Sequence, residues 1–221
     1  MPPRPTNPPT ARLEALHERI AILRFLDPAC GCGNFLVITY RELRALELEI
    51  LLELHRNELS ETQHEFSFDV TKLSKVDVDQ MHGIEIEEFP AKITEVALWL
   101  ADHQANIALS ETFGQLYRRI PLKKSPHIVC ANALRTDWKT VLPPEQCSYV
   151  LGNPPFVGKH YQNAEQKADM GVVFGEFDNN GDVDFVVSWF VKAADYIRGT
   201  TIRCALVSTK NIVQGEQLPI I

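Results

Sequence analysis

The sequence predicts an α/β protein in which a mostly parallel sheet is covered by helices on both faces. Short apolar segments alternate with longer segments whose apolar residues recur at helical spacing. The first apolar segment leads through a glycine-containing turn directly into a long helix, which is how a Rossmann-like unit opens. The chain has 221 residues, 45% of them hydrophobic, so it can bury a sizeable core.

The charge balance argues against unaided binding to nucleic acid. Lys and Arg total 22 and Asp and Glu total 29, a net charge of −7, whereas gripping phosphates requires a positive surface. We find no signal segment and no run that approaches the ~18 apolar residues of a membrane span. Five cysteines without a Cys-x-x-Cys pair favour a cytoplasmic setting with buried thiols. The seven histidines lack ligand spacing, so no metal site is expected.

The N-terminal region is predicted to lead into the first strand. Residues 1–10 contain five prolines and are expected to form a disordered or extended lead-in. In residues 11–22 the apolar side chains Leu13, Leu16 and Ile20 recur at the spacing of a short amphipathic helix. Residues 24–26 are then predicted to form the opening strand.

A long helix is predicted after the glycine turn, from residue 36 to about residue 57. Its expected core face is aliphatic, and five charged residues are expected off that face. The aliphatic set is Leu36, Ile38, Leu43, Leu46, Ile50, Leu51 and Leu54, and the charged set is Arg41, Glu42, Arg44, Glu49 and Glu53. Residues 60–80 are polar and irregular and are expected to form a connection with room for a small hairpin.

The rest of the chain continues the alternation. Strands are predicted at residues 81–86, 127–130, 148–152 and 204–208, and helices from Pro90 toward residue 109 and over residues 182–198, with Asp182 or Asp184 near the start of the latter. The basic segment 111–125 fits either a solvated linker or a phosphate contact. Residues 157–181 are predicted to form a long loop with one helix over 164–174, and loops of this length are uncommon unless functional.

Unusual residues follow the first predicted strand, and ligands of such sheets bind beyond the carboxyl ends of the strands. Residues 27–35 read Asp-Pro-Ala-Cys-Gly-Cys-Gly-Asn-Phe. Gly31 and Gly33 permit a tight turn and the close approach of a ligand, although a purely structural turn has the same need. The third glycine of the dinucleotide fingerprint and the Gly-Lys-Ser/Thr of a P-loop are missing. Pyrophosphate is therefore not expected, and Asp27 suits a ligand with positive charge.

Polar residues also follow the second and third strands. Glu85 stands where a carboxylate can accept hydrogen bonds from both hydroxyls of a ribose. The alternative is a surface glutamate beside Glu87 and Glu88. Asn132 follows the third strand, where its amide can read an adenine edge or, alternatively, cap a helix.

The fourth strand leads into Asn153-Pro154-Pro155-Phe156. The two prolines donate no backbone hydrogen bond and hold φ at about −65°, so they end the strand and keep the turn rigid. An amide oxygen, the Pro154 carbonyl and the Phe156 ring together suit a planar group that carries an NH2. The alternative is a proline turn with the ring tucked into the core. Four unusual features at one edge of the sheet favour a binding site.

These motifs resemble the class I S-adenosylmethionine-dependent amino-methyltransferases of DNA. Residues 27–35 are similar to their first motif and residues 153–156 to their catalytic motif. The resemblance narrows to the methyltransferase core of the MmeI-like single-chain type II restriction–modification enzymes, and it covers residues 25–217. The supporting segments are 83–86, 132–134, 182–185, 207–211 and 214–217.

The resemblance implies a cofactor and a role for each matched residue. S-adenosylmethionine would be held by Asp27, Ala29, Gly31 and Gly33 at its amino-acid part and sulfonium, by Glu85 at the ribose, and by Ile86 and Asn132 at the adenine. A flipped-out adenine of double-stranded DNA would donate its amino group to Asn153 and the Pro154 carbonyl and stack on Phe156. Pro155 completes this catalytic turn. Two acceptors off the amino plane free the nitrogen lone pair for methyl transfer, and no metal is required.

The resemblance also implies a seven-stranded sheet, of which five strands can be placed. The chain is therefore expected to be a partial methyltransferase core over residues 11–221, with the target-recognition and nuclease domains, and the DNA affinity, on absent parts. The fifth strand is expected to be an exposed edge that favours a homodimer. Two other functions stay open: methylation of a protein glutamine amide or of RNA, and a catalytically silent cofactor-binding or assembly module.

Overall fold

The core of the protein is a five-stranded sheet. A computed structural model describes residues 8–56, 73–114, 125–175 and 183–213. The strand order is β3-β2-β1-β4-β5, and all neighbouring strands are parallel. This confirms the predicted Rossmann-like α/β class, and each strand lies within two residues of its expected bounds. The strands are β1 (Phe25–Asp27), β2 (Met81–Glu85), β3 (His127–Cys130), β4 (Tyr149–Gly152) and β5 (Arg203–Leu206).

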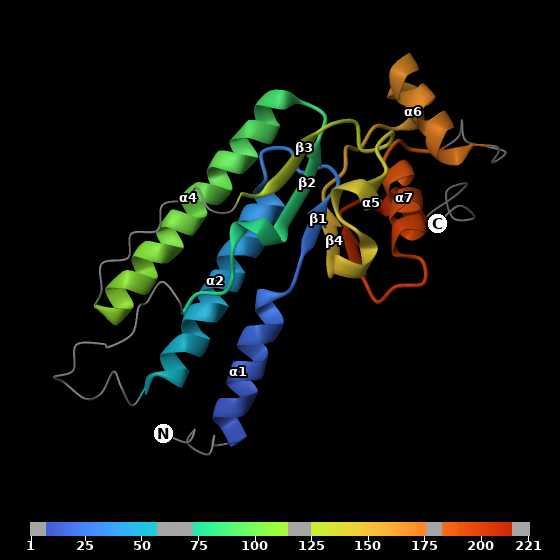
Figure 1. The fold of residues 1–221 in the computed structure, drawn as a ribbon. Helices are drawn as coiled ribbons and strands as arrows, with labels where there is room; N and C mark the ends of the chain where they lie inside the picture. Colours follow the sequence, from blue (N-terminus) through green and yellow to red (C-terminus); the bar gives the residue numbers. More distant parts are fainter. Residues whose placement is uncertain (1–7, 57–72, 115–124, 176–182, 214–221) are drawn as a thin grey trace.

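Helices cover both faces of the sheet, as Figure 1 shows. One face carries α1 (Pro8–Ala21), α2 (Asn34–Leu54) and α4 (Glu88–Phe113), and the other carries α5 (Trp138–Val141), α6 (Ala164–Phe174) and α7 (Val187–Ile197). Successive residues of strand β1 pack on opposite faces of the sheet. Phe25 belongs to the hydrophobic cluster with α1, α2 and α4, whereas Leu26 belongs to the cluster with α5, α6 and α7. The central strand β1 is therefore buried along its length, as parallel sheets require.

Several helix bounds differ from the prediction. α1 begins at Pro8, so residues 8–10 of the expected lead-in are helical, because proline is well tolerated in a first helical turn. α4 begins at Glu88 and runs to Phe113, into the expected basic loop. α7 begins at Val187, because the residues just before it are held in the core and Phe185 N donates to Val157 O (2.9 Å). α6 has its predicted bounds.

Parts of the prediction fall outside the described residues. Most of the connection expected to carry a hairpin lies within residues 57–72, and the basic residues of segment 111–125 lie within residues 115–124. The same holds for Asp182 and for residues 214–217.

The buried face of α2 is more polar than the sequence predicts. Ile38 and Leu46, expected in the core, are 57% and 37% exposed. Arg44, expected off the core face, is 5% exposed, and Glu47 is 1% exposed. The prediction for Arg44 is wrong because its charge has partners on the neighbouring helix α4.

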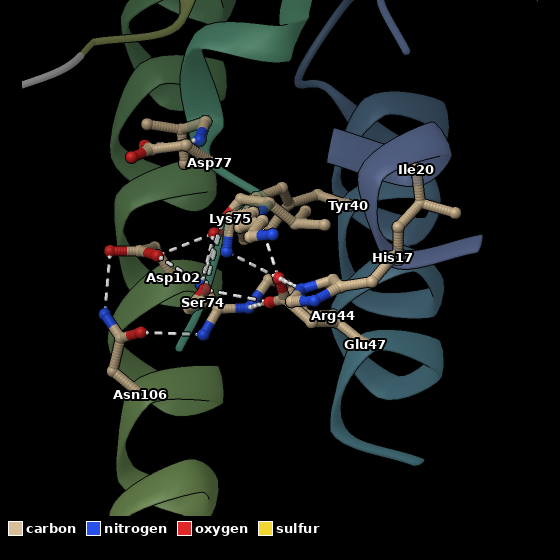
Figure 2. A network of polar contacts seen from close by, with 12 residues as sticks. His17, Ile20, Tyr40, Arg44, Glu47, Ser74, Lys75, Asp77, Asp102 and Asn106 are labelled. Atoms are coloured by element: carbon tan, nitrogen blue, oxygen red, sulfur yellow. Dashed lines mark hydrogen bonds and ion pairs between the residues drawn. The ribbon is translucent and has the colours of Figure 1, made fainter. Parts of the chain in front are cut away.

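Arg44 and Glu47 belong to a polar network between α1, α2 and α4 (Figure 2). Arg44 donates to Asp102 Oδ1 of α4 (3.1 Å), and Glu47 Oε1 lies 2.9 Å from His17 Nε2 of α1. Burial alone raises the pKa of Glu47, but the bond from His17 and the Arg44 charge bring that pKa below its ordinary value. Because a buried charge is costly without such partners, the network fixes how the three helices pack.

The cysteines are all free. Cys30 and Cys147 are buried, as expected, but Cys32, Cys130 and Cys204 are exposed. The last three lie in the loop after β1 and on the two outer strands of the described sheet. Among the described helices, none is long and apolar enough to cross a membrane.

Candidate active site

A cleft of about 510 Å³ opens where the first four strands end. It unites six of the eleven residues that the sequence singles out as site residues. These are Ala29, Glu85, Ile86, Asn132, Asn153 and Pro155. The other five, Asp27, Gly31, Gly33, Pro154 and Phe156, belong to the same loops but do not line the cleft. The predicted cofactor residues after β1, β2 and β3 thus meet the predicted catalytic turn after β4.

Asp27 lies among the central strand ends and is 1% exposed. Its Oδ1 accepts a hydrogen bond from Ala29 N (3.0 Å). Gly152 of β4 lies against it, since a Cβ at that residue would come within 2.5 Å of Asp27 Oδ1. Burial raises the pKa of Asp27 to about 7, the bond from Ala29 lowers it, and the charge of Glu85 raises it further. A cation in the cleft would therefore favour the ionised form of this carboxyl group.

Glu85 joins the first loop to the end of β2. Its Oε2 accepts from Gly31 N (2.8 Å) and its Oε1 from Glu87 N (3.1 Å). A carboxylate offers about four acceptor positions, so about two remain for hydroxyl groups in the cleft. Glu85 is therefore part of the cleft wall rather than an unengaged surface glutamate.

The turn at Gly31 and Gly33 depends on glycine. Their φ angles are 55° and 82°, a left-handed conformation that side chains disfavour. Thr94 of α4 closes the turn, because its Oγ1 donates to Gly31 O (2.8 Å). A Cβ on Gly33 would lie 2.7 Å from Thr94 Cγ2. Thr94 therefore supports the loop, although no pattern in the sequence around Thr94 predicts this role.

Asn132 makes two hydrogen bonds with its side chain. The Oδ1 atom accepts from Leu134 N (2.9 Å), a local capping bond of the kind raised as the alternative. The Nδ2 atom donates to Asp169 Oδ2 of α6 (2.8 Å). The amide nevertheless lines the cleft, so capping and ligand contact are compatible.

The predicted catalytic turn faces outward from the end of β4. Pro154 is buried, whereas Asn153, Pro155 and Phe156 are exposed. Phe156 is 45% exposed, which contradicts the alternative of a ring tucked into the core. Within the described residues, the Asn153 side chain makes no hydrogen bond. Its amide and the neighbouring ring are therefore free to contact a ligand.

α6, α7 and the residues just before them complete the cleft with side chains that are not among the predicted site residues. Asn163 could be found in principle, because it caps α6 reciprocally with Gln166, a pattern of a helix start. Trp189 of α7 donates from Nε1 to Pro28 O (3.0 Å) and so holds the first loop from the other side. The additional lining residues are Asn163, Glu165, Gln166, Asp169, Phe185 and Trp189. Among the described residues, no group of three or more His, Cys, Asp or Glu side chains could hold a metal ion.

Fold and cleft together define a class I methyltransferase unit. The sheet order β3-β2-β1-β4-β5 is combined with an acidic glycine loop after β1, a carboxylate after β2 and an amide–proline–proline–aromatic turn after β4. The family model of the MmeI DNA-methyltransferase domain matches residues 5–221. The chain belongs to this family, which implies a methyl donor as its cosubstrate.

Individual relatives are longer than this chain. DNA methyltransferase A of Bacillus subtilis (strain 168) is 39% identical over 213 residues, which is 95% of this chain and 23% of that protein. The type IIL restriction-modification enzyme MmeI in complex with DNA is 53% identical with a TM-score of 0.88, over 96% of this chain and 28% of that one. The DNA-bound type ISP enzyme LlaBIII, 14% identical with a TM-score of 0.52 over 91% of this chain and 14% of that one, shares the fold alone.

Proposed function

We propose that this chain carries the catalytic site of an S-adenosylmethionine-dependent DNA adenine-N6 methyltransferase, as the core of a restriction–modification enzyme. One observation carries the proposal: the exposed turn at Asn153 shares a cleft with the cofactor-type residues Glu85 and Asn132. Membership of the MmeI family and its DNA-bound member support double-stranded DNA as the substrate. The free cysteines fit the cytoplasm as its setting.

The cleft residues fit S-adenosylmethionine by their chemistry. Asp27 is a buried carboxyl group whose ionised form a cation favours, and Gly31 has no atom within 4 Å of the place where a Cβ would stand. Glu85 retains acceptor capacity for ribose hydroxyls, and Ile86, 56% exposed, offers an apolar surface to the adenine. The loop assigned to the amino-acid part of the cofactor contains Asp27, Ala29, Gly31 and Gly33. When bound, the cofactor supplies the methyl group.

The catalytic turn supplies orientation rather than acid–base chemistry. The lone pair of the adenine amino nitrogen is delocalised into the ring, which makes it a poor nucleophile. Asn153 Oδ1 and the Pro154 carbonyl each accept one of the two amino hydrogens. Because these acceptors lie off the amino plane, they favour a tetrahedral nitrogen and free the lone pair. The Phe156 ring stacks on the flipped base, a contact worth ~1–3 kcal/mol.

Asn153 provides the test. Asn153→Ala should abolish methyl transfer and leave the affinity for S-adenosylhomocysteine near normal, because the residue serves the acceptor base. Asn153→Asp keeps oxygen acceptors at the same place and should retain measurable activity. Transfer of radiolabelled methyl to DNA, RNA and protein, with calorimetry of S-adenosylhomocysteine, measures both properties. An Asn153→Ala rate that is merely halved contradicts the catalytic assignment.

The same assay separates the alternative functions. Methylation of RNA or of protein, with DNA left unmodified, would overturn the substrate assignment. Binding of S-adenosylhomocysteine without transfer to any of the three acceptors would favour a catalytically silent module.

The edge strand β5 supports a second element of the proposal, a homodimer. Arg203, Cys204 and Ala205 are exposed on this strand, which lies at the end of the described sheet. Unpaired backbone groups on a sheet edge favour pairing with another strand. Light scattering tests this, since a clean monomer at high concentration excludes the pairing.

A further inference from the structure

Asp169 on α6 has a set of contacts that methyl transfer does not explain. It lines the proposed cofactor cleft and is 4% exposed. Asn132 Nδ2 donates to its Oδ2 (2.8 Å), and Arg135 Nε donates to its Oδ1 (2.5 Å). Burying a carboxylate is costly unless donors of this kind satisfy it. The two donors therefore hold Asp169 in one orientation, and the hydrogen bond to Asp169 in turn restrains the Asn132 amide.

The hydrogen-bonding capacity of Asn132 shows what is left for a ligand. A side-chain amide has two acceptor positions on oxygen and two hydrogens on nitrogen. Leu134 N occupies one acceptor position, and Asp169 takes one hydrogen. One acceptor and one donor position remain. An adenine edge presents the complementary pair, an amino group beside a ring nitrogen. Hypoxanthine carries a carbonyl in place of the amino group and presents an acceptor there.

Asp169 also decides which way the amide of Asn132 faces. An ionised carboxylate only accepts hydrogen bonds, so the NH2 end of the amide must face it. A turned amide would bring Oδ1 against a carboxylate oxygen and would leave Leu134 N facing an NH2 group. The donor and acceptor positions that remain toward the cleft are thereby fixed.

We propose that Asp169 is a positioning residue that sets the orientation of the Asn132 amide and so makes the cofactor site select adenine over hypoxanthine. The inference rests on the proposed function, because it requires an adenosyl cofactor in this cleft. Asp169 acts through Asn132 and is not itself a catalytic residue.

Arg135 makes the inference testable. Asp169→Asn places one oxygen and one NH2 where the wild type has two oxygens. Arg135 and Asn132 bond different oxygens of Asp169, so the single oxygen of asparagine can stand opposite only one of them, and the charged guanidinium is the stronger donor. The new NH2 then faces the NH2 of Asn132. Adding Arg135→Met frees the oxygen for Asn132 and should restore the orientation. The Arg135 side chain is 51% exposed, so methionine is tolerated there.

Calorimetry of the full chain measures the selectivity. The probes are S-adenosylhomocysteine and S-inosylhomocysteine, and the readout is the ratio of their two dissociation constants. Asp169→Asn should lower the preference for the adenine probe about tenfold, the size of one hydrogen bond. The double variant should return to within about twofold of the wild type. Lys167→Gln is the control, because it removes a charge from an exposed position of α6 that does not line the cleft, and it should keep the ratio.

Each outcome decides the matter. A ratio that Asp169→Asn leaves unchanged, or one that the double variant leaves low, overturns the positioning role. Asp169→Ala is the second variant should Asp169→Asn fail to fold, and its tenfold loss should persist when Arg135→Met is added, since no oxygen is present to be freed. A wild-type chain that binds neither probe overturns the proposed cofactor instead, and this failure is seen before any variant is compared.

Discussion

Gly33→Ala and Gly31→Ala together separate backbone strain from steric clash in the first loop. Both glycines have left-handed φ angles, 82° and 55°. A Cβ on Gly33 would lie 2.7 Å from Thr94 Cγ2 and 2.9 Å from its Oγ1, whereas a Cβ on Gly31 would meet nothing within 4 Å. Gly31→Ala is thus a matched control that carries the strain without the clash.

The expected losses in the free energy of unfolding differ accordingly. The left-handed conformation costs a non-glycine residue about 1–2 kcal/mol, and this applies to both variants. In Gly33→Ala, Thr94 must also move, but it is 0% exposed and its Oγ1 donates to Gly31 O (2.8 Å). Losing that bond costs about 1 kcal/mol more. The methyl group of Thr94 is also buried, so it has no free space to move into. We expect about 1–2 kcal/mol for Gly31→Ala and about 2–4 kcal/mol for Gly33→Ala.

Urea denaturation followed by circular dichroism measures these losses. Thr94→Ala removes the two atoms that approach Gly33 most closely, so the loss on Gly33→Ala should be smaller in that background. The double-mutant cycle gives the coupling energy between the two positions. A loss for Gly33→Ala no larger than for Gly31→Ala, or a cycle without coupling, would refute the reasoning.

Buried titratable groups give three further predictions, all measured by urea denaturation. Burial and the neighbouring His127 lower the pKa of His82 from 6.5 to about 4. The free energy of unfolding should therefore fall by up to about 3 kcal/mol as the pH drops from 6.5 to 4. His82→Leu should remove this pH dependence. The pKa of Asp27 is raised from 3.8 to about 7, chiefly by burial, so its stabilising contribution is lost as the pH rises through that range. Asp27→Asn should then increase the free energy of unfolding at pH 8 by up to about 4 kcal/mol, with little effect at pH 4; equal effects at both would contradict the assignment. Glu47→Gln should lower the free energy of unfolding by about 3 kcal/mol, because the new NH2 group faces hydrogen-bond donors such as His17 and because Arg44 loses a charged partner. A loss below about 1 kcal/mol would show that the network is dispensable.

The strands, and the meeting of the motifs at one edge of the sheet, are the parts that the sequence predicts well. Four of the five short apolar runs lead into a residue of unusual type, at Asp27, Glu85, Asn132 and Asn153. These residues gather at one edge of the sheet, because parallel strands bring their carboxyl ends there, and all of them except Asp27 line the cleft. The assignment of a role to each residue came from the family resemblance and not from these patterns alone.

Residues whose burial or orientation depends on a partner far away in the sequence could not be predicted from these patterns. Helical spacing places Arg44 on the polar face of α2, and partners such as Asp102, 58 residues later, make its burial favourable. Asp169 is likewise separated from Asn132 by 37 residues. Periodicity records the spacing along one helix, but it does not record which helix packs against it.

The hydrogen bond from Trp189 to Pro28 spans 161 residues, and it bears on the order in which the protein matures on the ribosome. Synthesis delivers the N-terminal part first, so the loop after β1 emerges long before the helix that holds it. Until α5, α6 and α7 follow, Leu26 and Ile84 lack most of their partners on that face of the sheet. The nascent chain therefore presents an apolar sheet surface until these helices have emerged, and this is the kind of surface that chaperones bind. The cleft should be complete only when α7 has docked and Trp189 has reached Pro28.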